Sequence, residues 1–317
     1  MIKKRALCIF LVFFAASLFC ADNVFAGAWT VPKYKVWSEY YTRWSYGKDA
    51  YNSDWKLQST QSTGAKNFRV RDFTQEPKFE YGVTDWLTAL ASVQFESTIY
   101  KEYQRPNYGI YYQEGYTVKN RACNAVRIGG RWRIIDVPFV LSTQTKVSIY
   151  PRYGINRGDT ANKGPLLGAY QDLENSPSLG YGNDSLEQRI LIGKAFFVPL
   201  TKTYKLPCYG GAEAGYVWNN RTVANGYVWF LEGGFWPFPW LLVKSELDAY
   251  KSQDGTGKFE KAYGIWRIGG AWQVFGGDSV LRQGSKLFNL EFDYGLTIWG
   301  KNTTAYQEFI FKMDTQF

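Results

Sequence analysis

Hydrophobic and polar side chains alternate along most of this chain, in segments of about ten residues. Between residues 87 and 96, every odd position is apolar and most even positions are polar. A period of two places successive side chains on opposite faces of a β-strand. Segments of this length, apolar on one face and polar on the other, are typical of the strands of a transmembrane β-barrel.

Twelve such segments follow one another along the chain. The second is the least regular, because its alternation slips near Asp72 and Phe73, where we expect a β-bulge. Twelve is an even number, as single-chain barrels of the bacterial outer membrane require when both termini are periplasmic. The segments are residues 34–46, 68–81, 87–96, 126–134, 139–149, 186–196, 208–218, 227–235, 241–248, 266–274, 288–296 and 308–317.

The connections between segments differ at the two ends of the predicted barrel. Tight turns occur at residues 82–85, 136–138 and 237–239, whereas the other connections are longer, the longest at 153–185. Short periplasmic turns and long extracellular loops are the usual asymmetry of these barrels. Aromatic residues cluster at both ends and predict two interfacial girdles; they include Trp86, Trp132, Trp236, Trp240 and Phe317 at the periplasmic end, and Trp44, Tyr150, Trp218, Tyr250 and Trp299 at the other.

The first 26 residues predict a signal peptide. Lys3, Lys4 and Arg5 precede an apolar run at residues 6–19, and small or aliphatic residues at 24–26 favour cleavage before Gly27. No later apolar run is long enough for a transmembrane helix. The predicted fold class is therefore all-β: a single antiparallel transmembrane β-barrel of about 12 strands over residues 27–317, preceded by a signal peptide and placed in the bacterial outer membrane.

Composition agrees with a protein that has two solvents. Aromatic residues make up 19% and charged residues 21% of the chain, and the mean hydropathy is −0.33. Many aromatics beside frequent charges suit lipid outside and water or polar packing inside. The net charge is +9, but no run of basic residues resembles a nucleic-acid-binding patch. The expected partners are outer-membrane lipid, lipopolysaccharide and a small-molecule solute, and no nucleic acid.

Several kinds of chemistry have no support in this sequence. It contains no histidine, which removes Ser-His hydrolases and histidine-based metal sites. We expect no enzymatic activity, no cofactor and no bound metal. Cys123 and Cys208 fall near opposite ends of the predicted barrel, so we expect no disulfide between them.

The polar face of the predicted strands carries charges of both signs. Glu246 with Asp248 and Glu291 with Asp293 form pairs spaced by two, so each pair points into the lumen. A glycosidase would need an extended sugar cleft, and we favour the interpretation that these carboxylates neutralise inward arginines. The predicted pore-lining residues are Arg127, Arg131, Arg189, Arg267, Glu187, Glu246, Asp248, Glu291 and Asp293.

A short sequence motif occurs in two of the segments. Arg127-Ile128-Gly129-Gly130-Arg131-Trp132 resembles Arg267-Ile268-Gly269-Gly270-Ala271-Trp272, six strands apart. Two interpretations are open: a duplicated half-barrel, or a recurring local solution with glycines beside an interfacial tryptophan.

Three stretches are similar to a known family. They are Gly27 to Lys33 (GAWTVPK), Glu80 to Leu87 (EYGVTDWL) and Leu186 to Lys194 (LEQRILIGK). They resemble outer-membrane channel proteins grouped with the phenol meta-cleavage pathway and the wider fatty-acid-transporter-like set. The resemblance implies an outer-membrane channel, although the twelve segments differ from the fourteen strands of the fatty-acid transporters.

The two ends of the barrel segment add two expectations. About seven residues separate the predicted cleavage site from the first strand, so we expect no N-terminal plug. The closing segment, with alternate aromatics and a terminal Phe317, resembles the signal that the outer-membrane assembly machinery recognises.

These observations lead to two functional hypotheses. The first is a passive channel for a small solute, with a polar, mixed-charge lumen that sets selectivity. The alternative is a structural or interaction barrel with a plugged, salt-bridged interior and functional extracellular loops.

Overall fold

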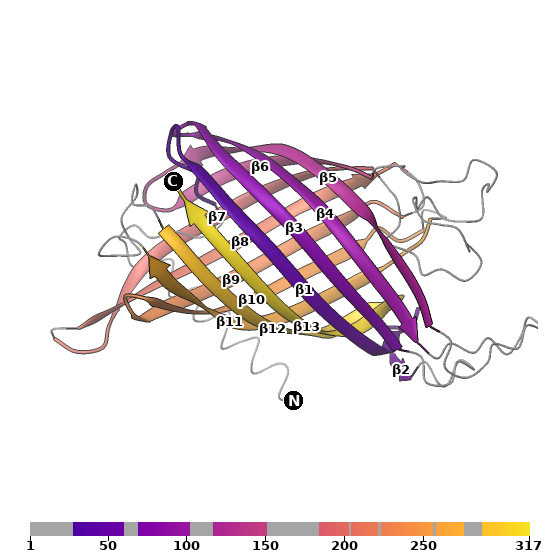
Figure 1. Ribbon diagram of the computed structural model, residues 1–317. Coiled ribbons are helices and arrows are strands. Elements are labelled where there is room, and N and C mark those ends of the chain that lie inside the picture. Colours follow the sequence, from indigo (N-terminus) through magenta and orange to yellow (C-terminus); the bar gives the residue numbers. More distant parts are fainter. Residues whose placement is uncertain are drawn as a thin grey trace, which may run out of the picture.

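The computed structural model describes residues 28–59, 69–101, 117–150, 184–202, 204–220, 223–255, 258–275 and 287–317. The predicted signal peptide and nearly all of the predicted 153–185 loop lie outside these residues. The described chain is composed of β-strands and their connections (Figure 1). The described residues include no helix that is long and apolar enough to cross a membrane.

Thirteen strands form one antiparallel sheet that closes on itself through the pairing of β13 with β1. The three-residue β2 pairs only with β1, so twelve strands build the barrel wall, as the alternation predicts. The strands are β1 Val36–Tyr51, β2 Leu57–Ser59, β3 Arg69–Thr84, β4 Leu87–Lys101, β5 Thr117–Ile135, β6 Val140–Ile149, β7 Ser185–Pro199, β8 Lys205–Asn219, β9 Gly226–Phe238, β10 Leu241–Ser252, β11 Ala262–Phe275, β12 Leu287–Lys301 and β13 Thr303–Gln316.

The first and last strands close the barrel along their whole length. β1 and β13 lie side by side in Figure 1, and their register runs from Trp37 opposite Gln316 to Tyr51 opposite Thr303. Beyond the ladder, the backbone of Val36 and that of Phe317 exchange two hydrogen bonds of 2.9 and 3.0 Å. Closure leaves no unpaired sheet edge, which a strand structure needs in lipid.

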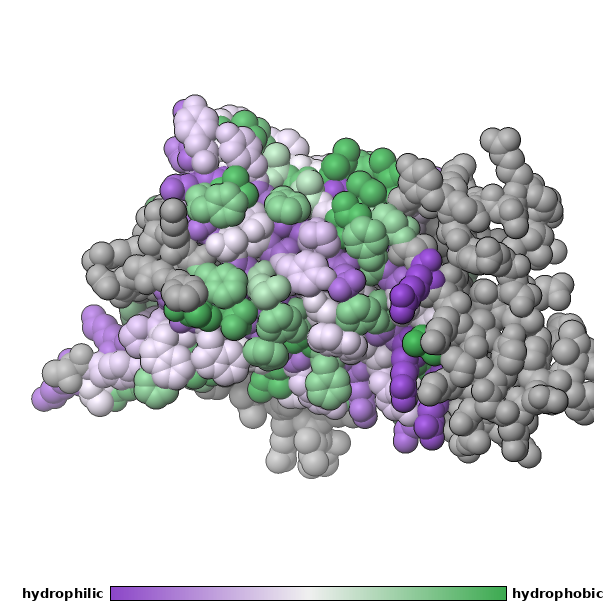
Figure 2. All heavy atoms as spheres, viewed as in Figure 1, coloured by the Kyte–Doolittle hydropathy of each residue, from purple (hydrophilic) through white to green (hydrophobic). Residues whose placement is uncertain are grey.

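The two faces of the wall differ as the period of two requires. Many large apolar side chains are exposed on the outer face, among them Ile128, Trp229, Ile268, Phe292 and Phe309, and Figure 2 shows hydrophobic side chains spread over the strands in view. Buried polar and charged side chains lie on the inner face, including Gln144, Lys244, Arg267, Glu291 and Glu308. The predicted fold class of an all-β transmembrane barrel is confirmed.

The predicted bulge near Asp72 and Phe73 is wrong. The β1–β3 ladder runs without a shift from Val36 opposite Tyr81 to Gly47 opposite Val70. Asp72 is buried on the inner face, and Phe73 contacts Trp44 on the outer face. The alternation slips because Val70 is buried on the inner face near the strand end, where exposed arginines occupy the outer one.

Three aromatics assigned to the interfacial girdles lie inside the barrel instead. Trp236 packs against Tyr209 in a buried cluster, and Tyr150 and Tyr250 line the interior cavity. Their positions along the strands are as predicted, but strand parity turns their side chains inward. Trp86, Trp218 and Trp240 are exposed.

Both cysteines of the barrel segment are free thiols. Cys123 lies on β5 and Cys208 on β8, which are separated in the sheet by β6 and β7. The expectation that they form no disulfide is confirmed.

Candidate functional site

The barrel encloses a cavity of about 600 Å³. Charged and polar side chains from inward positions make up most of its wall, because the same parity that sends apolar groups to lipid sends these groups inward. Seven of the nine residues predicted to line a pore border this cavity: Arg127, Arg131, Arg189, Arg267, Glu187, Glu246 and Asp248.

Ion pairs between β3 and β5, which lie on either side of β4, cover this part of the cavity wall. Arg131 on β5 binds Glu80 on β3 with two hydrogen bonds of 3.1 Å, a bidentate arrangement. Arg127 pairs with Glu76 at 2.5 Å, again from β5 to β3. Each pair crosses β4, so these side chains lie over the intervening strand and face the lumen.

The β6–β8 part of the wall repeats this arrangement. Arg189 on β7 contacts Glu187 and Glu213, both at 2.8 Å. Lys146 on β6 reaches the same Glu187 at 2.8 Å. Glu187 is thus shared between two cations, and its attraction to both is strengthened where the dielectric is low.

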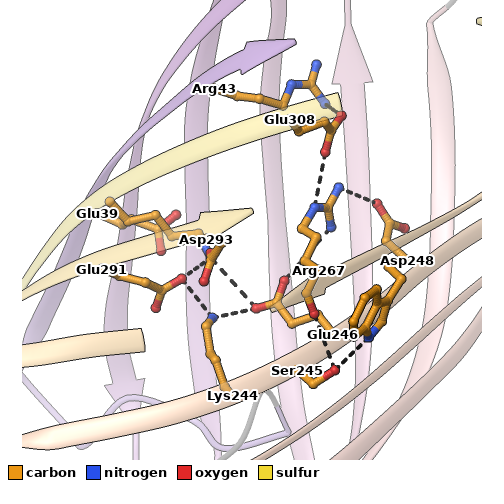
Figure 3. A network of polar contacts seen from close by, with 12 residues as sticks. Glu39, Arg43, Lys244, Ser245, Glu246, Asp248, Arg267, Glu291, Asp293 and Glu308 are labelled. Carbon is orange, nitrogen blue, oxygen red and sulfur yellow. Dashed lines mark hydrogen bonds and ion pairs between the residues drawn. The ribbon is translucent and has the colours of Figure 1, made fainter. Parts of the chain in front are cut away.

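A second cluster lies on β10, β12 and β13 (Figure 3). The Lys244 ammonium lies between Glu246 and Glu291, at 2.7 Å from Glu291. Lys312 contacts Glu291 as well and lies 3.2 Å from Asp293. The two remaining predicted residues, Glu291 and Asp293, therefore belong to this buried cluster in the wall.

Arg267 on β11 links this cluster to the closing strands (Figure 3). Its guanidinium lies 3.2 Å from Glu308, 3.4 Å from Asp248 and 3.9 Å from Glu246. Glu308 is only 1% exposed and also pairs with Arg43 on β1 at 3.5 Å. The predicted neutralisation is confirmed for Arg267, which pairs with Glu246 and Asp248. Glu291 and Asp293 pair with Lys244 and Lys312 instead. Other inward carboxylates, Glu76, Glu80 and Glu213, neutralise Arg127, Arg131 and Arg189.

Three of these carboxylates are close enough to suggest a metal site. Oxygen atoms of Glu246, Glu291 and Asp293 lie within 4.8 Å of one another. However, Lys244 and Lys312 already place two ammonium groups among them and supply the positive charge that a metal ion would bring. We therefore assign no metal to this cluster.

The glycine repeat makes room for these clusters. Gly129 lies opposite Lys146 of β6, and Gly269 lies opposite Lys244 of β10, all on the inner face. A Cβ at Gly129 would overlap the Thr145 carbonyl oxygen, and one at Gly269 would overlap the Asp293 carboxylate. Each repeat thus admits a charged side chain from a neighbouring strand, which supports the interpretation of a recurring local solution.

We expect Gly269→Ala to lower the free energy of unfolding by about 1–3 kcal/mol, because the new methyl group must displace the Asp293 side chain and the Phe292 backbone. Gly233→Ala is the matched control, since its Cβ would meet nothing nearer than the Tyr209 carbonyl oxygen at 3.6 Å. Urea unfolding of both variants in phospholipid vesicles measures the difference. Equal stabilities would contradict this packing argument.

The segment before β1 enters the periplasmic end of the barrel. Ala28 is 1% exposed and packs with Trp29 against Val140 and Leu191 on the inner wall. The Ser142 hydroxyl donates a hydrogen bond to the Ala28 carbonyl oxygen. No separate plug domain is therefore needed to occupy this end: the few residues before β1 run back into the lumen, which the expectation of no N-terminal plug did not foresee.

Polar contacts fix the same segment further along. Arg131 donates a hydrogen bond of 2.9 Å to the Trp29 carbonyl oxygen, and the Val31 amide donates one of 2.8 Å to Thr88. Gly82 and Gly193 lie so close to the segment that a Cβ there would overlap the Pro32 carbonyl and the Trp29 ring. Residues 28–33, which we call the N-terminal segment, thus narrow the periplasmic end.

The β8–β9 connection narrows the extracellular end. Val223 and Ala224 are buried, and Val223 borders the cavity. The Tyr250 hydroxyl and the Asn219 side-chain amide both donate hydrogen bonds of 2.9 Å to the Ala224 carbonyl oxygen. We call residues 223–225 the extracellular lid.

The β10–β11 connection supports the lid from outside. Val223 forms an isolated bridge with Phe259, and the Ala224 amide donates a hydrogen bond of 3.1 Å to the Phe259 carbonyl oxygen. Nearby, hydrogen bonds from Lys301 and from the Gly255 amide lower the pKa of Glu260. This connection is therefore ordered by its own polar contacts.

Sequence reasoning missed two groups of residues at this site. Glu308, Lys244 and Lys312 are not among the predicted pore-lining residues, because nothing in a single strand marks them as the centre of a cluster. The N-terminal segment and the extracellular lid were not expected at all. An apolar Trp29 and Val31 in a segment with no strand of its own was the available signal for the first.

No known family model matches the sequence, and no curated protein matches it. The solved structures that resemble it include the COG4313 outer membrane channel from Pseudomonas putida F1, with 12% identity over 93% of this chain and 100% of that one and a TM-score of 0.57. That likeness shows the fold. A Pseudomonas aeruginosa FadL homologue (9% identity, 95% of both chains, TM-score 0.34) and the translocator domain of the autotransporter NalP from Neisseria meningitidis (11% identity, 89% and 87%, TM-score 0.37) are too distant to carry an argument.

The closed barrel, its apolar outer face and this structural likeness identify the architecture. This architecture is that of a β-barrel of the bacterial outer membrane. The sequence predicts the same location.

Proposed function

We propose that this protein is a passive outer-membrane channel for a small solute. The observation that carries the proposal is the cavity of about 600 Å³ inside a closed barrel, walled by charged and polar side chains instead of being filled by apolar ones. Rings of charge set selectivity in other pores. The residues proposed to line the path are Arg127, Arg131, Arg189, Arg267, Glu187, Glu246 and Asp248, with Glu291 and Asp293 supporting the wall behind them.

Ion conductance of the purified protein in planar bilayers tests this proposal. We expect discrete, small conductance steps, because the N-terminal segment and the extracellular lid both narrow the path. A barrel that conducts no ions at any applied voltage would contradict the proposal.

The alternative is a structural or interaction barrel, and one observation favours it. The N-terminal segment, the apolar cluster of Ala195, Tyr209 and Trp236, and the ion pairs of Lys244 all lie inside the barrel. Such a barrel would conduct no ions, and its function would lie in the extracellular loops. The same bilayer experiment therefore separates the two candidates.

We further propose that the chain works without a cofactor or a catalytic step, since it offers no histidine base or ligand. The mature protein would begin near Gly27, after removal of the signal peptide. Lipopolysaccharide and outer-membrane lipid would contact its apolar outer face.

We also propose that Phe317 is read by the assembly machinery. Its side chain is 54% exposed, while its backbone closes the barrel with Val36. Phe317→Ala is therefore expected to lower the amount of protein assembled in the outer membrane several-fold and to leave the stability of the folded barrel nearly unchanged. Phe292→Ala, on the neighbouring strand β12 and exposed to a similar extent, is the control. Equal assembly of the two variants, in quantitative blots of outer-membrane fractions, would argue against a signal at Phe317.

A further inference from the structure

The extracellular half of the cavity wall formed by β8–β11 differs from the ion-paired walls. Val217, Val228 and Tyr250 form a buried apolar cluster, and Tyr263 packs against it. The register places Val228 opposite Tyr250 and Tyr250 opposite Tyr263, so these residues form a continuous patch across three strands. Aromatic and aliphatic side chains therefore make up most of this part of the wall. Asp248, which pairs with Arg267, borders the cavity beside it.

Part of this patch faces the cavity. Val217 and Tyr250 of the patch border the cavity, as does Phe230 on β9. Val223 borders the cavity from the extracellular lid. The lid is tied to the patch, because the Tyr250 hydroxyl donates a hydrogen bond to the Ala224 carbonyl oxygen. An apolar surface therefore lies directly beneath the extracellular entrance.

One ammonium group lies at this surface. The Lys261 Nζ atom lies 5.4 Å from the ring centroid of Tyr250 and 5.9 Å from that of Tyr263, and Lys261 borders the cavity. Contact with ring faces favours the charged form of an ammonium and holds it at the apolar surface. Apolar walls lower the local dielectric and strengthen its attraction for an anion.

From this juxtaposition we infer that the extracellular half of the cavity is a binding subsite for small amphipathic carboxylates. The carboxylate would bind Lys261, and an apolar body about the size of one ring would lie against Tyr250, Phe230 and Val223. The cavity volume is within the range of pockets that enclose small organic molecules. The inference rests on the proposed function in one respect: it names the class of solute that the channel would accept.

Equilibrium binding to the detergent-solubilised full chain tests the subsite. The probes are benzoate, benzyl alcohol and benzylamine, which share a ring and differ in charge. We expect benzoate to bind more tightly than the neutral alcohol and the cationic amine to bind least, as measured by isothermal titration calorimetry. Lys261→Gln is expected to weaken benzoate binding about tenfold, the size of one charge-assisted hydrogen bond, and Lys261→Arg is expected to retain most of the affinity.

Lys251→Gln is the matched control. Lys251 lies at the extracellular end of β10 and forms an exposed ion pair with Asp254, so its loss should leave benzoate binding unchanged. Benzoate binding no tighter than that of benzyl alcohol in the unmodified protein would overturn the inference. Equal affinity of Lys261→Gln and the unmodified protein would overturn it as well.

The comparison of the three probes needs no variant, so a misfolded Lys261→Gln protein would leave the test intact. Failure of this inference also differs from failure of the proposed function. A conducting barrel without benzoate preference overturns only the subsite. A barrel that binds benzoate but conducts no ions overturns the channel and leaves the subsite standing.

Discussion

Arg267→Met is expected to lower the free energy of unfolding of the barrel by about 3 kcal/mol. The substitution removes one cation from among Glu308, Asp248 and Glu246, two of which are almost fully buried. A carboxylate left in the wall without its partner keeps its desolvation penalty and loses the attraction that offset it. We expect the low end of the range for broken buried pairs, because Arg43 still contacts Glu308.

Urea unfolding in phospholipid vesicles measures this loss. Lys251→Met is the control, since its exposed pair with Asp254 should contribute about 1 kcal/mol or less. The double variant Arg267→Met/Asp248→Asn should recover part of the lost stability, because it also removes the carboxylate whose ion pair is lost with Arg267. Arg267→Met and Lys251→Met variants of equal stability would show that the buried network does not stabilise the barrel.

Replacing residues 28–32 with an equal length of alternating glycine and serine is expected to raise the single-channel conductance several-fold. The exchange removes the Trp29 ring and the buried Ala28 and Val31 side chains from the periplasmic end of the lumen. A glycine–serine chain is flexible and buries little apolar surface, so it has no reason to stay folded against the wall. The open cross-section should then be limited by the extracellular lid.

The measurement is single-channel current in planar bilayers at a fixed salt concentration. Leu200→Ser serves as the control, because Leu200 is exposed in the β7–β8 connection and touches neither the cavity nor the N-terminal segment. An unchanged conductance in the glycine–serine variant would mean that this segment does not limit flow. The barrel itself should remain folded, since the closing pair of β1 and β13 is untouched.

Much of the fold was predictable from local pattern. All twelve barrel strands follow from alternation, because lipid and lumen each select one chemical character at every second residue. The error near Asp72 has the same origin: beyond the lipid, outward positions become polar and the pattern no longer distinguishes the faces. The inward direction of Trp236 and Tyr250 was accessible from parity, but aromatic character at a strand end favoured the interface.

For the candidate site, the inward direction of the side chains was predictable, but their ion-pair partners were not. Strand parity alone sends Arg127, Glu187 and Arg267 inward, so the sequence by itself determined which side chains face the lumen. Which carboxylate meets which cation depends on register between strands. Arg131 and Glu80 lie 51 residues apart, and Arg43 and Glu308 lie on the first and last strands of the barrel. No local pattern encodes such a pairing.

The sequence by itself determined the outer-membrane location, the number of strands and the two faces of the wall. Each of these follows from the order of apolar and polar residues along single strands. Only the tertiary structure decided what occupies the interior. The N-terminal segment folds back onto Thr88, Arg131 and Ser142, and the extracellular lid folds onto Tyr250. Both result from contacts between parts of the chain that meet only when the barrel has closed, and they set the size of the cavity between them.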